Sequence, residues 1–151
     1  MNEHSFVRSF HKRLDPQLNI WKIYDPYQGG VPDALIFGTG GKSCFVEYKY
    51  VKALPKRMST IIKPSLSAQQ SVWLNDKIAR GLLALVILGS KEGVVIFRRP
   101  SEWDNGFPRG EANIKTPTEA AAELGELLGV RDSAEELEVQ GLSAASRRRT
   151  G

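Results

Sequence analysis

The sequence predicts a single α/β domain built on a mixed central β-sheet of about five strands flanked by helices. Its 151 residues, 41% of them hydrophobic, suffice for one domain with a core of its own. Segments with helical and strand patterns follow the order α-β-β-β-α-β-β-α, which favours one sheet with helices on its faces. The unbroken apolar run 82–88 is typical of a strand buried on both faces of such a sheet.

The chain is predicted to begin with a helix and a strand. Apolar residues at helical spacing indicate a helix over 3–14, and Asp15-Pro16 ends it because the residue before proline avoids the helical conformation. β-branched and aromatic residues indicate a strand over 19–25. The two prolines and paired glycines of 25–32 then indicate a loop.

A β-hairpin and a helix are predicted next. The stretches 33–37 and 43–51 flank a glycine-rich turn, which is typical of paired strands. Ser67 and Gln70 have the spacing of a capping box, in which each side chain bonds the backbone N–H of the other residue. This box predicts a helix that runs to residue 81.

The last part of the chain is predicted to hold two strands, 82–88 and 93–97, and one more helix. A second capping box, Thr116 with Glu119, begins that helix, which we expect to end at residue 128. The segment 98–115 between them is expected to be loop-like. We assign residues 1–129 to the folded domain, with its core in 3–97, and expect 130–151 to be a weakly ordered tail because its composition is polar and small.

Some classes of protein are excluded by composition. The single cysteine, Cys44, cannot form an intramolecular disulfide and favours a reducing, cytoplasmic setting. No segment reaches the roughly 20 apolar residues needed to cross a bilayer, so no membrane partner is expected. The N-terminal residues do not have the pattern of a signal peptide.

A basic stretch indicates a polyanionic partner. The sequence carries a formal net charge of +4, and no acidic residue occurs between Tyr48 and Asn75. Five cations fall in this stretch: Lys49, Lys52, Lys56, Arg57 and Lys63. Binding to nucleic acid is the functional interpretation. A solvated loop that happens to be basic is the alternative.

Asp33, Glu47 and Lys49 are the residues that point to chemistry. Glu47 and Lys49 are two apart on a predicted strand, so their side chains leave the same face, and Cys44, on the opposite face, can pack on the core. If the hairpin forms, Asp33 comes near Glu47. Two carboxylates with one lysine suit Mg²⁺, which takes one or two protein carboxylates and leaves room for water and substrate phosphate. An ordinary exposed strand face is the alternative interpretation of this triplet.

Three short motifs resemble those of a known family. Gly30-Val-Pro-Asp33, Phe45-Val-Glu-Tyr-Lys49 and Leu66-Ser-Ala-Gln-Gln70 are similar to the motifs of PD-(D/E)XK nucleases, in particular the VRR-NUC branch and phage-type Holliday-junction resolvases. The resemblance covers about residues 3–97. It implies a restriction-endonuclease-like fold and a Mg²⁺- or Mn²⁺-dependent phosphodiesterase that acts on DNA. It is compatible with a phage-encoded protein acting in a bacterial host.

The resemblance also implies roles for individual residues. Asp33, Glu47 and the backbone carbonyl of Tyr48 would bind the metal, and Lys49 would be the catalytic lysine. Glu3 matches an acidic residue on the first helix that aids metal or water binding, although an acid in a first helical turn is also favoured by the helix dipole. Gln70 matches a glutamine that follows the motif, although its capping role is a sufficient reason for its presence.

The family pattern is interrupted by a basic insertion, residues 51–64, which we call the basic arm. We interpret Lys52, Lys56, Arg57 and Lys63 as its DNA-binding residues. Branched DNA is the expected substrate, and a homodimer is expected because symmetric cutting of two strands needs two sites in fixed relation. A nicking, flap or repair nuclease of the VRR-NUC type is one alternative, and a catalytically silent DNA-binding module is another. We expect Trp21, Trp73 and Trp103 to be packing residues.

Overall fold

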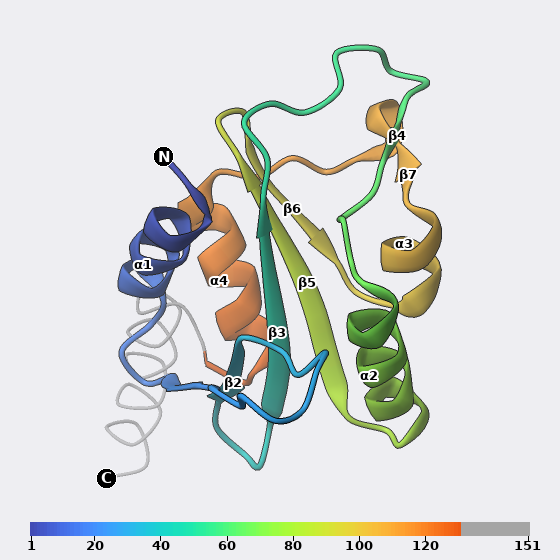
Figure 1. Cartoon of the computed structure of the whole chain (residues 1–151). Coiled ribbons are helices and arrows are strands. Elements are labelled where there is room, and N and C mark those ends of the chain that lie inside the picture. The colour runs from blue at the N-terminus through green and yellow to red at the C-terminus, as the bar shows by residue number, and fades with distance from the viewer. Residues whose placement is uncertain (131–151) are drawn as a thin grey trace, which may run out of the picture.

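A five-stranded mixed sheet with helices on both faces forms the centre of the molecule, as the computed structural model, which describes residues 1–130, shows (Figure 1). The strand order is β1-β2-β3-β5-β6, with all pairs antiparallel except β3 and β5, which are parallel. The strands are β1 (Asn19–Lys22), β2 (Ala34–Phe37), β3 (Ser43–Tyr50), β5 (Leu83–Ser90) and β6 (Gly93–Phe97). The predicted fold class is confirmed.

One face of the sheet is covered by α1 (Glu3–Arg13) and α4 (Pro117–Leu127). Phe10 and Leu124 are fully buried there against the inward side chains of β3 and β5. The helix after Thr116, which lies outside the region of resemblance, is therefore part of the main core. Its predicted capping box is present, because Thr116 and Glu119 exchange side-chain to backbone hydrogen bonds.

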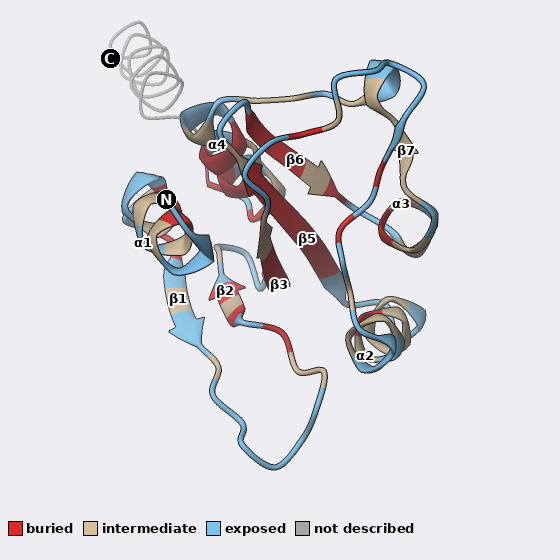
Figure 2. Ribbon diagram, turned by 45° about the horizontal axis from the view of Figure 1, so that its top comes forward, coloured by how far each residue is buried: buried red, intermediate tan, exposed pale blue. Residues whose placement is uncertain are grey.

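The opposite face is covered by α2 (Ala68–Ala79) and α3 (Pro100–Asn105). Leu74 and Trp103 pack there against Val86 and Phe97 in a second hydrophobic cluster. Because β5 lies between the two clusters, its side chains are buried from residue 84 to residue 89, which confirms the prediction from its apolar run. Figure 2 shows β5 as the most continuously buried strand of the sheet.

The segment 98–115 is not the loop that the sequence predicts. It contains α3, the short strand β7 (Phe107–Pro108) and a 3₁₀ turn, Arg109–Glu111. Arg99, at the N-cap of α3, supplies no capping side chain, so the usual signal of a helix start is missing. Tertiary contacts hold the helix instead: Trp103 is fully buried, and its indole N–H donates to Asn75 Oδ1 at 2.9 Å.

Three smaller differences concern the edges of the predicted elements. The predicted strand 19–25 ends at Lys22, because Asp25 and Pro26 begin a turn. Trp21, which was expected to be a packing residue, is 57% exposed on this edge strand. Val130, assigned to the tail, is buried, and the rest of that tail, 131–151, lies outside the described residues. No helix within residues 1–130 has the length and apolarity to span a membrane.

Candidate active site

Asp33 and Glu47 lie opposite each other where β2 begins beside β3. Ala34 pairs with Val46 in the antiparallel register, which sets the preceding Asp33 beside Glu47. One carboxylate oxygen of Asp33, Oδ2, accepts the backbone N–H of Tyr48 at 2.9 Å. The Asp33 side chain thus takes the place of a backbone acceptor next to the β2–β3 ladder, and the hydrogen bond fixes the orientation of its carboxylate. The backbone carbonyl of Tyr48 points to the same side of β3 as its N–H, past the end of β2.

Glu47 is the one buried charged residue of the described chain, with 3% of its surface exposed. Burial, followed by the negative charge of Asp33, raises its pKa from 4.5 to about 8, while Lys49 acts in the opposite direction. Lys49 Nζ lies 4.0 Å from Glu47 Oε1. The carboxylate therefore lies in an electrostatically unfavourable place that one lysine does not fully offset.

Gln70 connects α2 to this carboxylate. Its Oε1 accepts the backbone N–H of Ser67 at 2.9 Å, which completes the predicted capping box. Its Nε2 donates to Glu47 Oε1 at 3.0 Å. The two interpretations from sequence, helix capping and a place in the site, are therefore compatible. The amide oxygen of Gln70 caps the helix, and its amide nitrogen contacts Glu47.

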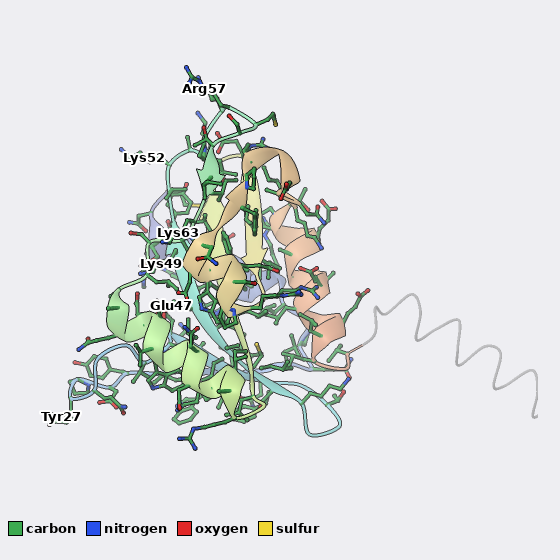
Figure 3. The ribbon with its side chains drawn as sticks, turned by 90° about the vertical axis from the view of Figure 1, so that its right-hand side faces the viewer. Tyr27, Glu47, Lys49, Lys52, Arg57 and Lys63 are labelled. Atoms are coloured by element: carbon green, nitrogen blue, oxygen red, sulfur yellow. The ribbon has the colours of Figure 1, made fainter. Side chains whose placement is uncertain are left out.

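A cavity of about 290 Å³ opens beside Asp33, between α1 and the β1–β2 end of the sheet. Glu3 lines it together with Asp33 and Tyr48, and its charge also contributes to the raised pKa of Glu47. The structure thus brings together all five candidate residues, namely Glu3, Asp33, Glu47, Lys49 and Gln70. Figure 3 shows Glu47 and Lys49 on the central part of the molecule, in front of the sheet.

The cavity wall also holds two cations, Arg8 and Lys22, that the sequence did not indicate for the site. Arg8 and His11 from α1 and Lys22 from β1 line the same cavity as Asp33. His11 Nε2 lies 2.7 Å from the Tyr48 hydroxyl, and burial together with Lys22 lowers the pKa of His11 to about 4. Helical spacing places Arg8 and His11, which are three residues apart, on one face of α1, but only the packing of α1 against β3 shows that this face meets the site.

The donor set fits a hard divalent cation better than a closed zinc site. Within residues 1–130, no group of three or more His, Cys, Asp or Glu side chains could hold a metal ion. Zinc sites use several His and Cys ligands, whereas Mg²⁺ takes one or two carboxylates and completes its shell with water and phosphate. Burial of Glu47 and the charge of the neighbouring Asp33 raise the pKa of Glu47, and a divalent cation between the two carboxylates would offset both effects.

Two other features do not offer chemistry of this kind. Cys44 is buried on the opposite face of β3, as the alternation predicts, and burial raises its thiol pKa to about 12. A wider cavity of about 500 Å³ lies against α4, but its two cations, Arg98 and Lys115, both pair with one acid of its wall, Glu123.

The basic arm begins where β3 ends at Tyr50, one residue after Lys49, and is held in place by the second hydrophobic cluster and by β7. Leu54 and Ile62 are buried in the second cluster, and β4 (Ile61–Ile62) pairs with β7. The backbone N–H groups of Arg109 and Gly110 donate to the arm's carbonyls. All four cations of the arm are exposed, and none forms an ion pair within the described chain: Lys52, Lys56, Arg57 and Lys63.

Replacing these four cations of the arm by Ala is expected to weaken DNA binding mainly by removing phosphate contacts. Each lost contact should lower the slope of log affinity against log salt concentration by roughly 0.9 on duplex DNA. Fluorescence anisotropy over a salt series measures this slope. Lys42→Ala, an exposed cation in the turn at the other end of β3, is the control and should leave the slope within error. An unchanged slope in the fourfold variant would exclude the arm from the DNA surface.

Comparison with known proteins yields a likeness of fold. No family model matches the sequence, and no curated protein matches it either. Among solved structures, the chain is similar to Hjc, a Holliday junction resolvase from the archaeal hyperthermophile Archaeoglobus fulgidus, at 17% sequence identity and a TM-score of 0.42. The match covers 72% of this chain and 94% of that chain. A likeness of this size does not decide function, which has to be argued from the geometry of the site.

Proposed function

We propose that this protein is a metal-dependent endodeoxyribonuclease of the PD-(D/E)XK type that hydrolyses phosphodiester bonds of branched DNA. The observation that carries the proposal is the buried Glu47 carboxylate beside Asp33, with Lys49 and Gln70 on the same carboxylate oxygen. A buried carboxylate beside a second acid lowers stability unless a cation joins them, which is the expected cost of a metal site. We also propose that the protein acts in the cytoplasm.

In this proposal Asp33, Glu47 and the Tyr48 carbonyl hold Mg²⁺ or Mn²⁺. When bound, the ion would supply Lewis acidity toward the phosphate and make water a stronger nucleophile. Lys49 offsets negative charge that builds on the phosphate, and Gln70 keeps the Glu47 carboxylate oriented through its 3.0 Å hydrogen bond. Glu3, on the wall of the cavity, is placed to orient water or the ion. The cations Arg8 and Lys22 flank the path by which a phosphate would approach.

Branched DNA and a homodimer are the finer parts of the proposal. A domain this small has one site and cuts one strand per encounter, so symmetric resolution of a four-way junction needs a second copy related by two-fold symmetry. The resemblance of its motifs to those of phage-type resolvases and VRR-NUC nucleases supports the same substrate class.

Purified protein is expected to cleave four-way and flapped DNA faster than linear duplex in Mg²⁺ or Mn²⁺. EDTA should stop the reaction, and Ca²⁺ should support binding without turnover because it tolerates looser geometry than Mg²⁺. The assay compares linear, nicked, flapped and four-way DNA of the same sequence, and light scattering on the same sample gives the molecular mass. A monomer that nicks flaps and junctions equally would leave a VRR-NUC-type nicking or repair nuclease. Metal-independent binding without any cleavage would leave a silent DNA-binding module.

A further inference from the structure

The three most exposed aromatic side chains of the described residues all lie within seven residues of one another. Trp21 is 57% exposed, Tyr24 is 89% exposed and Tyr27 is 96% exposed. The chain has thirteen Trp, Tyr and Phe residues, so this clustering is not a general property of its aromatic side chains. We call residues 21–27 the aromatic loop. Figure 2 shows the connection between β1 and β2 extending from the body of the molecule as an exposed segment.

The aromatic loop has no packing role in the folded chain. Within residues 1–130, none of its three rings pairs with another aromatic ring, and neither tyrosine hydroxyl has a hydrogen-bond partner. A ring that remains this exposed contributes little burial energy. Its neighbours, Lys22, Asp25 and Gln28, are polar and exposed, so the rings are separate flat surfaces and not one apolar patch suited to a protein partner.

The loop is nevertheless fixed relative to the candidate active site. Asp25 Oδ1 accepts the backbone N–H groups of Tyr27 and Gln28 at 2.9 and 3.1 Å, which closes a turn that contains Tyr27. Three residues after the loop, Gly30 packs so closely on Gln69 that a Cβ at Gly30 would meet the Gln69 carbonyl oxygen at 2.5 Å. Gln69 precedes Gln70, which contacts Glu47, and Asp33 follows Gly30 by three residues.

The loop and the basic arm lie on opposite sides of the candidate active site. In Figure 3 Tyr27 lies at one end of the molecule, Lys52 and Arg57 lie at the other, and Glu47 and Lys49 lie between them. Trp21 is on the face of the sheet that carries Glu47, because Trp21 pairs with Leu35 and Leu35 with Phe45, two residues before Glu47. A nucleic acid that follows the cations of the arm through the site would meet these rings next.

We infer that the aromatic loop is a stacking platform for unpaired bases of DNA next to the cleaved phosphate. Aromatic side chains hold unstacked bases by their π-faces, whatever the base, and duplex DNA does not offer such bases. The platform would thus favour DNA with unpaired or branched segments over perfect duplex. The inference rests on the proposed function in one respect, namely that the ligand is DNA, and it does not require the protein to cleave.

The test is a binding experiment in Ca²⁺ with the full chain, using duplex and flapped DNA that carry 2-aminopurine at the branch. Tyr27→Ala and Tyr27→Leu should each lower affinity for flapped DNA about tenfold, whereas Tyr27→Phe should keep it, because stacking needs a ring and not only apolar bulk. Wild-type protein and Tyr27→Phe should quench the 2-aminopurine fluorescence, and Tyr27→Leu should not. Duplex affinity should change less than about twofold in all three. Gln28→Ala, in the same exposed turn, is the matched control.

Each contrary result would overturn the inference. Equal binding by Tyr27→Leu and wild-type protein would show that the ring is not needed, and an equal loss on duplex DNA would show that it does not select unpaired bases. A change of molecular mass in Tyr27→Ala, measured by light scattering without DNA, would show that the loop is an interface between two copies. Binding that depends on the Tyr27 ring, without cleavage in Mg²⁺, would contradict the proposed nuclease function but support the stacking platform. Failure of the proposed function can therefore be distinguished from failure of this inference.

Discussion

Replacing Glu47 by Gln should abolish DNA cleavage and, at the same time, make the metal-free protein more stable at neutral pH. The loss of cleavage follows from the removal of one of two carboxylates that would hold the ion, and we expect at least a thousandfold lower rate, equivalent to about 4 kcal/mol of transition-state stabilisation. Asp33→Asn should have the same effect on cleavage. Its amide oxygen can still accept the Tyr48 N–H, so the β2–β3 pairing should be kept.

The gain in stability follows from the sign of the pKa shift. The pKa of Glu47 is raised from 4.5 to about 8, so in the folded protein the carboxyl group resists ionisation that the unfolded chain permits. Below pH 4.5 the Glu47 carboxyl group is protonated in the folded and in the unfolded protein, so it does not lower the free energy of unfolding. This free energy falls as the pH rises from 4.5 to about 8, because the unfolded chain ionises there and the folded protein does not. Gln is neutral throughout and can still accept the Gln70 amide. We therefore expect about 2–4 kcal/mol more stability for Glu47→Gln at pH 7.5.

Thermal and denaturant unfolding in EDTA measure this difference. The advantage of Glu47→Gln should shrink toward zero as the pH is lowered to 4.5, and Mg²⁺ should raise the Tm of the wild-type protein but not that of the variant. Glu126→Gln, the same change of charge at an exposed position on α4, is the control and should alter neither stability nor cleavage. A Glu47→Gln variant that is less stable at pH 7.5, or that cleaves normally, would contradict the description of the site.

Lys49→Ala should lower the cleavage rate about a hundredfold to a thousandfold and change DNA affinity less than about threefold. Removal of a single group that stabilises charge in a transition state has an effect of this size. Lys49 lies 4.0 Å from Glu47 and is only partly exposed, so it is poorly placed to act as one more phosphate contact on the surface. Single-turnover cleavage in Mg²⁺ and anisotropy in Ca²⁺ separate the two effects.

Lys52→Ala is the matched control for Lys49, since it removes an exposed lysine three residues further along the chain. It should weaken binding slightly and leave the single-turnover rate at saturating DNA unchanged. Lys49→Arg should recover part of the rate, because it keeps the charge but not the compact ammonium group. If Lys49→Ala and Lys52→Ala had the same profile, Lys49 would belong to the binding surface and not to the chemistry.

The core of the candidate site could be predicted because it depends on local patterns. The alternation of apolar residues along β3 determines the face of Glu47 and Lys49, and the short turn before it determines which residue of β2 lies opposite. The capping box placed Gln70 at the start of α2. These features need only a few neighbouring residues, so the sequence contains enough information to predict them.

Other parts depend on contacts between distant segments. The hydrogen bond of Gln70 to Glu47 requires α2 to lie over β3, and nothing near residue 70 indicates this position. α3 was missed because its stability comes from the burial of Trp103 and not from a cap. The exposure of Trp21 could not be inferred from its residue type, because it follows from the position of β1 at the edge of the sheet.

The packing of α4 against α1 has a consequence for the protein during its synthesis. All five candidate residues lie within the first 70 positions, from Glu3 to Gln70. Glu47, however, lies on a strand that pairs with β5, and Glu3 lies on a helix whose core contacts include Leu124 and Leu128. A ribosome adds roughly 5–20 residues each second, and domains generally fold as units. We expect nascent chains to carry every candidate residue of the site for several seconds without activity, until residue 128 has left the ribosome.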